Sequence, residues 1–202
     1  MAEWFEQYWY LAVIFVVVCI IAAVIFYFAG RSYKAYRTSY KNQEAEIKRL
    51  IALKERFVPL SEKAILESDN AETLEGTALS YQLYLQKQED MEKEFALLSE
   101  AKRYIYILDV FVQDKSVADF FRENGDILRM EITKALSFIG MTEFAESIEK
   151  IRRMFDVDDE NTSFNEAEIE KMQAYIDEND ILTKVKLESA EYIKKNFQLF
   201  VN

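Results

Sequence analysis

The chain has 202 residues, with 25 Lys or Arg against 36 Asp or Glu, and its formal net charge at pH 7 is −11. It contains no histidine, which excludes a histidine general base, the usual Ser-His and Cys-His nucleophile pairs and imidazole metal ligands. No glycine-rich phosphate-binding loop occurs, and no inward-facing pair of carboxylates stands out. We therefore expect no enzyme, no catalytic residue, no cofactor and no metal site.

The first predicted element is a membrane-spanning helix. Residues 7–30 carry no charge and consist mainly of aliphatic and aromatic side chains. At about 1.5 Å per residue, a helix of this length covers roughly 35 Å and exceeds the hydrocarbon core of about 30 Å. Because the run is too long for the apolar region of a secretory signal, we interpret residues 1–30 as an uncleaved anchor in the lipid bilayer. Cys19, which lies in this span, is the only cysteine of the chain, so no intramolecular disulfide can form.

The charges beside this span predict its orientation. No Lys or Arg precedes the span, whereas six follow within twenty residues of its end. The positive-inside rule then places the N-terminus outside and the rest of the chain in the cytoplasm. We expect a single-pass protein of a bacterial inner membrane, while an extracytoplasmic placement of the following domain stays open.

A basic stalk, residues 31–57, follows the span. Its side chains step alternately by three and four residues through eight positions, of which six are apolar. These seam positions are Tyr33, Tyr36, Tyr40, Gln43, Ile47, Leu50, Lys54 and Phe57. The spacing is typical of a parallel coiled coil, which would make a homodimer through residues 33–57. The alternative is a helix that lies on its own domain or on lipid headgroups. Pro59 is expected to end the helix.

The remaining segment, residues 58–202, is predicted to be one acidic α-helical domain. Apolar residues recur at intervals of three and four, and no sustained strand-like alternation occurs. Four such stripes are Leu74, Ala78, Tyr81 and Leu85; Leu98, Ala101, Ile105, Leu108 and Val112; Phe144, Ile148, Ile151 and Phe155; and Ala190, Ile193, Phe197 and Phe200. We therefore expect an all-α protein, in which one transmembrane helix precedes a soluble helical bundle.

Short polar signals predict where individual helices begin and end. Asp69 or Asn70 suits the start of one helix, and Gly140 suits the end of another. Asn165 with Glu168 has the spacing of a capping box.

The charge of the domain limits its partners. Residues 64–202 contain sixteen Lys or Arg against thirty acids, a net charge of −14. Such a domain is repelled by phosphate, so we expect no direct contact with nucleic acid.

Acids are densest in the segment from Asp156 to Asp180. They are Asp156, Asp158, Asp159, Glu160, Glu166, Glu168, Glu170, Asp177, Glu178 and Asp180. A calcium-binding loop beginning at Asp156 lacks the glycine at its sixth place and the glutamate at its twelfth. Two interpretations remain, a solvated surface or a negative surface that binds a basic protein partner.

Residues 104–155 contain a set of motifs that suggests a family. The matching positions are Leu108 and Asp109, the pair Phe120 and Phe121, the turn Asn124, Gly125 and Asp126, and the helix end with Leu136, Ile139 and Gly140. The segment resembles the domain of the bacterial DNA-mimic protein (DMP) family. Where that family has Asn-Asn-Gly-Gly, this chain has Gln113, Asp114, Lys115 and Ser116, and so lacks both glycines. By themselves, the aromatic pair and the Asn-Gly-Asp turn are most simply core and helix-capping residues.

The resemblance implies an acidic helical protein that occupies the DNA-binding surface of a transcription regulator. We therefore expect a membrane-anchored protein-interaction module, a DNA mimic that binds a basic regulator. The alternative function is a scaffold or immunity-type membrane protein that oligomerises through its stalk.

Overall fold

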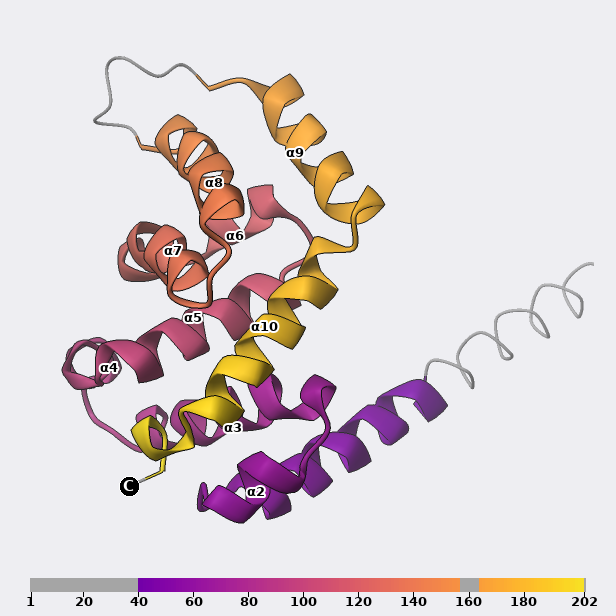
Figure 1. The fold of residues 1–202 in the computed structure, drawn as a ribbon, viewed down its shortest axis with the longest axis vertical. Coiled ribbons are helices and arrows are strands. Elements are labelled where there is room, and N and C mark those ends of the chain that lie inside the picture. Colours follow the sequence, from indigo (N-terminus) through magenta and orange to yellow (C-terminus); the bar gives the residue numbers. More distant parts are fainter. Residues whose placement is uncertain (1–39, 157–163, 202) are drawn as a thin grey trace, which may run out of the picture. The chain divides into compact units, whose positions relative to one another are not determined.

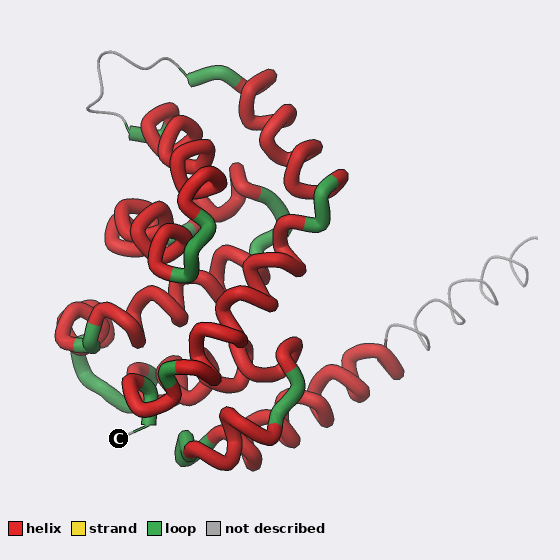
Figure 2. Tube along the Cα trace, viewed as in Figure 1, coloured by secondary structure: helices red, strands yellow, loops and turns green. Residues whose placement is uncertain are grey.

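The computed structural model describes residues 40–156 and 164–201. Within these ranges the chain forms helices and loops and contains no strand, which confirms the expected all-α class (Figures 1 and 2). The chain divides into two compact units, Met1–Ile51 and Ala52–Asn202, called here the N-terminal and C-terminal units.

The predicted membrane span lies outside the described residues. In the part of the chain that the structure describes, no helix is both long and apolar enough to cross a membrane. The start of the stalk, residues 31–39, also lies outside the described ranges.

Residues 40–57 are helical, and residues 40–51 are the described part of the N-terminal unit. Every side chain from 40 to 51 is exposed. Lys48 forms an ion pair with Glu44 at 2.7 Å, and Arg49 forms one with Glu46 at 2.8 Å. The helix ends two residues before Pro59, as expected from the missing amide hydrogen of proline.

The helices of the C-terminal unit follow in short succession along the chain. They are α2 (Glu62–Glu67), α3 (Asn70–Leu85), α4 (Met91–Leu97), α5 (Glu100–Gln113), α6 (Val117–Glu123), α7 (Asp126–Phe138), α8 (Thr142–Met154), α9 (Glu166–Glu178), α10 (Ile181–Lys195) and the 3-10 helix η1 (Phe197–Leu199).

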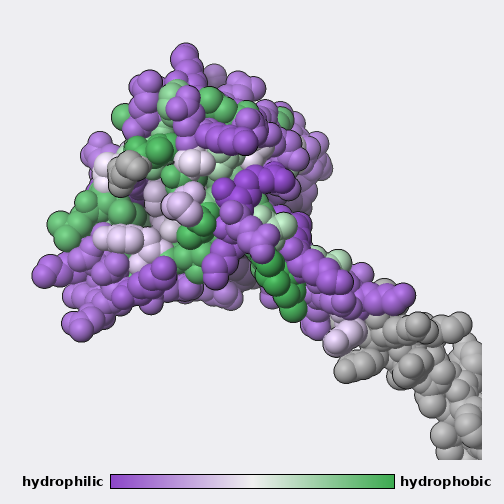
Figure 3. Space-filling model, turned by 90° about the horizontal axis from the view of Figure 1, so that it is seen from below, coloured by the Kyte–Doolittle hydropathy of each residue, from purple (hydrophilic) through white to green (hydrophobic). Residues whose placement is uncertain are grey.

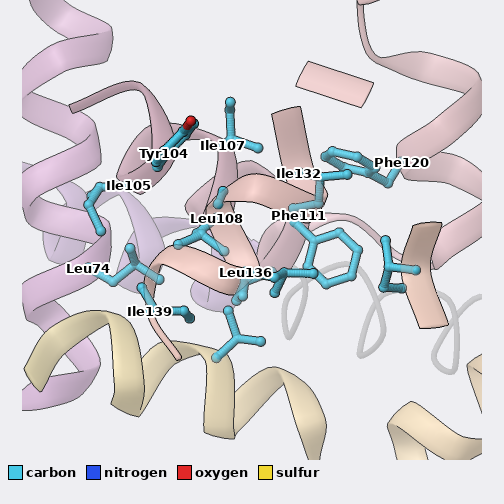
Figure 4. Close-up of a cluster of buried hydrophobic side chains, with 14 of the residues drawn as sticks. Leu74, Tyr104, Ile105, Ile107, Leu108, Phe111, Phe120, Ile132, Leu136 and Ile139 are labelled. Atoms are coloured by element: carbon cyan, nitrogen blue, oxygen red, sulfur yellow. The ribbon is translucent and has the colours of Figure 1, made fainter. Parts of the chain in front are cut away.

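Helix α5 forms the centre of the C-terminal unit and packs against α3, α7 and α10. Its side chains Ile105, Ile107 and Leu108 are fully buried although they point in different directions around the helix. Figure 4 shows side chains of α3, α5 and α7 meeting in this core, among them Leu74 and Leu136. A helix that is apolar on most sides therefore becomes the one around which the others pack.

Aromatic rings extend this core from α5 to α6. The rings of Phe111 and Phe120 meet edge to face at 5.2 Å, and Phe121 stacks on Phe155 at 5.4 Å. The two phenylalanines of α6 are fully buried. Packing of this kind explains why a seven-residue helix is held in place, since so short a helix has little stability of its own.

The four predicted stripes are buried or partly buried, but three of them cross the end of a helix, and in the third stripe Phe155 is the C-terminal cap of α8. Leu98 is the C-terminal cap of α4 and precedes α5. Phe200 follows η1 and is buried, whereas α10 has already ended at Lys195. The intervals of three and four therefore identified the core side chains correctly and overestimated the length of three helices.

All three predicted helix boundaries are confirmed, two of them with the expected capping geometry. The Asp69 side chain accepts a hydrogen bond from the Glu72 amide at the start of α3. After α7, Gly140 has a φ of +89°, which allows the Met141 amide to donate to the Leu136 carbonyl at 3.0 Å. Glycine reaches this φ without the strain that a side chain would cause.

The predicted capping box at Asn165 is wrong, although Asn165 does precede α9. Its side chain makes no capping hydrogen bond. Instead the Asn165 backbone carbonyl accepts from the amides of Glu168 and Ile169 at 3.2 and 3.3 Å. The backbone thus supplies the acceptor that the box would have supplied from a side chain.

A close approach joins the end of the 40–57 helix to α3 inside the C-terminal unit. Leu53 and Phe57 are buried in a small cluster with Ala64. A Cβ atom added at Gly76 would lie 2.5 Å from Cγ of the Phe57 ring, so only glycine fits there. Phe57, the last predicted seam position, is thus covered by its own unit.

Candidate functional site

Helix α9 carries the acidic segment in a defined arrangement. Glu166, Glu170 and Asp177 are separated by four and seven residues, so they lie within an arc of about 40° on one side of the helix. All three are exposed, while Ile169 and Ile176 form the buried line of the same helix. We call these three carboxylates the α9 acidic edge.

A single side chain, Gln173, links this edge to α6. Its Oε1 atom accepts a hydrogen bond from the Val117 amide at the start of α6, at 3.0 Å. Its Nε2 atom donates to Oδ1 of Asp177 at 2.9 Å. The two bonds fix α9 against α6 and hold one carboxylate of the edge in position.

The carboxylates of the α9 acidic edge have no cationic partner among the described residues. No Lys or Arg of residues 40–156 and 164–201 lies within ion-pair distance of Glu166, Glu170 or Asp177. Lys171, the one cation of α9, points to another side of the helix by its spacing. Their charge is therefore directed to solvent and available to a partner.

The other acids of the segment separate into different environments. Asp156 forms an ion pair with Arg152 at 3.6 Å and so belongs to the charges of α8. Glu168 and Glu178 are exposed on other sides of α9, and Asp180 directly precedes α10 with a φ of 49° and no side-chain capping bond. Asp158, Asp159 and Glu160 lie outside the described residues. The structure brings three of the ten acids onto one side of α9.

A second acidic cluster surrounds the turn between α5 and α6 and was not singled out from the sequence. Burial raises the pKa of Asp114, the Asn124 amide opposes this shift, and the charges of Glu123 and Asp119 add to it. The Asn124 Nδ2 atom donates to Asp114 at 2.8 Å and to the Phe120 carbonyl at 3.0 Å. In the sequence, the only sign of this cluster is that Asp114, Asp119 and Glu123 lie within ten residues, at spacings that suit no single helix.

The residues that carried the family resemblance have structural roles here. Leu108, Phe120 and Phe121 are buried in the core. Asn124 caps the end of α6, Gly125 precedes α7, and Asp126 begins α7 and pairs with Arg129. Asp109 accepts a hydrogen bond from Gln113 at 2.6 Å.

The turn at Gln113–Ser116 needs no positive φ. Apart from glycines, Asp180 is the residue with a positive φ among those described. Ser116 accepts a hydrogen bond from the Asp119 amide at 3.1 Å and caps α6. This chain lacks the two glycines of the Asn-Asn-Gly-Gly pattern, and the turn that it forms does not require them.

Two cavities of the C-terminal unit are lined without any residue of α9. One, of about 410 Å³, lies between α4 and the start of α7 and is lined mainly by apolar side chains such as Met91, Phe95 and Ile127. The other, of about 520 Å³, includes Lys102, which lies 5.8 Å from the centroid of the Tyr81 ring. Burial lowers the pKa of the Lys102 ammonium. On the face drawn in Figure 3, apolar patches interrupt a mostly hydrophilic surface.

The described residues contain no group of three or more Cys, Asp or Glu side chains arranged to hold a metal ion. The arrangement on α9 is suited to electrostatic recognition, because its carboxylates are exposed and fixed at one side of a helix. Comparison with known proteins gives no match, whether to a family model, to a curated protein or to a solved structure.

Proposed function

We propose that this chain is a membrane-anchored protein-interaction module whose α9 acidic edge binds a basic, nucleic-acid-binding protein. The observation that carries the proposal is the set of exposed carboxylates at Glu166, Glu170 and Asp177, which have no described cationic partner. A basic partner gains attraction here without breaking any ion pair that stabilises the fold.

The charge along α9 supports a partner that normally binds DNA. The helix has 13 residues and is therefore about 20 Å long, and its five carboxylates with Lys171 leave a net of one negative charge per about 5 Å; three of the five carboxylates form the α9 acidic edge. A single strand of B-DNA carries one charge per about 3.4 Å of its axis. The net negative charge of α9 as a whole is thus of the same order as that of a phosphate backbone, and this supports the proposal together with the resemblance to DNA-mimic proteins.

The test is a capture experiment with charge-matched variants. The full chain, held in detergent micelles, is immobilised and exposed to a native lysate of the cells that make it. Bound proteins are eluted with stepped salt and identified by mass spectrometry. We expect a DNA-binding regulator that elutes at moderate salt and that duplex DNA of its own target sequence displaces.

The variants separate the α9 acidic edge from net charge. One carries Glu166→Gln, Glu170→Gln and Asp177→Asn, and we expect it to bind that regulator at least about tenfold more weakly. The control carries Glu143→Gln, Glu146→Gln and Glu188→Gln, which are exposed and remove the same charge from α8 and α10. Equal retention by the two variants, or retention that DNA does not displace, overturns the proposal.

A further inference from the structure

The cavity between α4 and the start of α7, called here the α4–α7 cavity, has the size and lining of a small-molecule site. Its volume is about 410 Å³, and ligand pockets in proteins hold roughly 300–1,000 Å³. Leu85 of α3 and Phe95 of α4 are buried side chains of its lining, while Met91 and Ile127 are 50% and 37% exposed. A bound apolar molecule would therefore remove apolar surface of Met91 and Ile127 from water.

Three polar side chains line the same cavity. The Glu92 carboxylate makes no hydrogen bond or ion pair within the part of the chain that the structure describes. The Tyr106 hydroxyl makes no hydrogen bond with any described residue, and the Tyr106 ring packs edge to face on Phe95 at 5.3 Å. The third side chain, Asp126, forms an ion pair with Arg129. Glu92 and Tyr106 thus offer acceptors that the described fold does not use.

We propose that the α4–α7 cavity binds a small apolar amine. The ammonium group lies against Glu92 and Tyr106, and the apolar part of the molecule packs on Leu85, Phe95 and Met91. This inference goes beyond the proposed function and does not depend on the α9 acidic edge, because none of the described residues that line the cavity belongs to α9.

The charges around the cavity favour a cation. Residues 89–94 contain four acids and one base, and none of the described residues that line the cavity is Lys or Arg. A carboxylate ligand would meet the like charge of Glu92, whereas an ammonium meets the opposite charge. The positive end of the α7 dipole is offset by Asp126, the first residue of that helix, so this end does not favour an anion.

The donors of an ammonium also match the acceptors of the cavity. A primary ammonium has three N–H donors and no acceptor. One N–H binds the Glu92 carboxylate in a charge-assisted hydrogen bond, and a second binds the oxygen of the Tyr106 hydroxyl. An uncharged molecule of the same shape gains the apolar contacts alone. The charge of the ligand therefore decides its affinity.

Equilibrium dialysis with three small probes tests this charge preference. The full chain is held in micelles of an uncharged detergent, and micelles without protein give the blank for partitioning. The probes are phenethylammonium, 3-phenylpropanoate and 2-phenylethanol, which share a phenyl ring and a short chain and differ in charge. We expect phenethylammonium to bind at least about tenfold more tightly than the other two.

Variants of exposed residues test the contacts. We expect Glu92→Gln to weaken phenethylammonium binding about tenfold and to leave 2-phenylethanol binding unchanged, because the charge alone is removed. Glu89→Gln removes the same charge from an exposed residue outside the lining, so it is the matched control with unchanged binding. Met91→Lys brings a cation to the cavity at a half-exposed position and is expected to abolish amine binding. Circular dichroism should be the same for all three variants, since the substituted side chains are exposed.

Three results would each overturn the proposal. The first is the absence of phenethylammonium binding at about 10 mM, which is weak even for so small a molecule. The second is equal binding of the three probes, or tighter binding of 2-phenylethanol, which would indicate a site for uncharged apolar molecules. The third is equal weakening of phenethylammonium binding by Glu92→Gln and Glu89→Gln, which would indicate an effect of net charge alone.

Discussion

Helices α8 and α9 are both 13 residues long and follow each other in the chain, but they use their charges differently. Helix α8 has three acids and three bases, whereas α9 has five acids and one base. In α8 the Glu149 carboxylate accepts from Nε and Nη2 of Arg152 at 2.8 Å each and from Nε of Arg153 at 3.2 Å. The α9 acidic edge has no such partners.

The difference follows from spacing and has opposite consequences for the two helices. Arg152 and Arg153 come three and four residues after Glu149 and lie in the last turn, where they also complement the helix dipole. In α9 the last turn holds Asp177 and Glu178, which oppose the dipole. Charge at the end of α8 therefore stabilises the helix, while Asp177 and Glu178 at the end of α9 are retained at a cost to helix stability.

The largest expected effect tests how firmly each helix is held by the core. Ile148 of α8 is fully buried and Ile169 of α9 is 6% exposed. We expect Ile148→Ala to lower the free energy of unfolding by about 3–4 kcal/mol and Ile169→Ala by about 2 kcal/mol, because α9 has fewer buried side chains around it to leave a cavity. Urea denaturation measures both values. A larger loss for Ile169→Ala would reverse the order of the two helices.

The next effect tests the paired charges of α8. We expect Glu149→Gln to lower the free energy of unfolding by about 0.5–1 kcal/mol at pH 7, because Arg152 loses its carboxylate. The same change at exposed Glu170 of α9 is the matched control, and its effect is expected within about 0.5 kcal/mol of zero.

The pH dependence of this effect has a definite sign. The hydrogen bond from Arg152 is the main cause that holds the pKa of Glu149 below its usual range. A folded-state pKa below the unfolded one gives stability that is present above the unfolded value, near pH 4, and is lost as the pH falls through the folded value. The difference between the unsubstituted chain and Glu149→Gln should therefore shrink below about pH 4. A difference that grows on acidification would contradict the assignment.

The smallest expected effect concerns the helix dipole of α9. Glu178 is exposed and lies outside the α9 acidic edge. We expect Glu178→Lys to stabilise the protein by about 0.5 kcal/mol, because a cation suits the end of a helix. Thermal denaturation measures the gain, and it should diminish with salt. An unchanged affinity for the captured regulator would further separate Glu178 from the edge.

Much of the fold was predictable because helical spacing and capping are local properties. The interval of four between Leu74 and Ala78 and the glycine at position 140 each report on a few neighbouring residues. Two predictions from local spacing were wrong. Phe200 is buried beyond the end of the helix that it was expected to extend, and the Asn165 side chain does not cap α9. In both cases long-range packing or the backbone replaced the interaction that the spacing suggested.

The candidate site was only partly predictable. The density of acids between Asp156 and Asp180 was evident, and the pairing of Asp156 with Arg152 follows a spacing of four that the sequence already contains. The contact of Gln173 with Val117, 56 residues apart, has no local signal. Neither has the bond between Asp114 and Asn124, on which the environment of that acid depends.

The sequence by itself determined the all-α class, the main core stripes and the acidic character of residues 64–202, because each depends on residue type and short-range spacing. The tertiary structure decided which charges pair between helices, as Arg103 of α5 does with Glu131 of α7, and it placed Phe57 against Gly76. These outcomes depend on where helices distant in sequence come to lie together. Their positions follow from close packing of the whole core, and no short stretch of sequence contains that information.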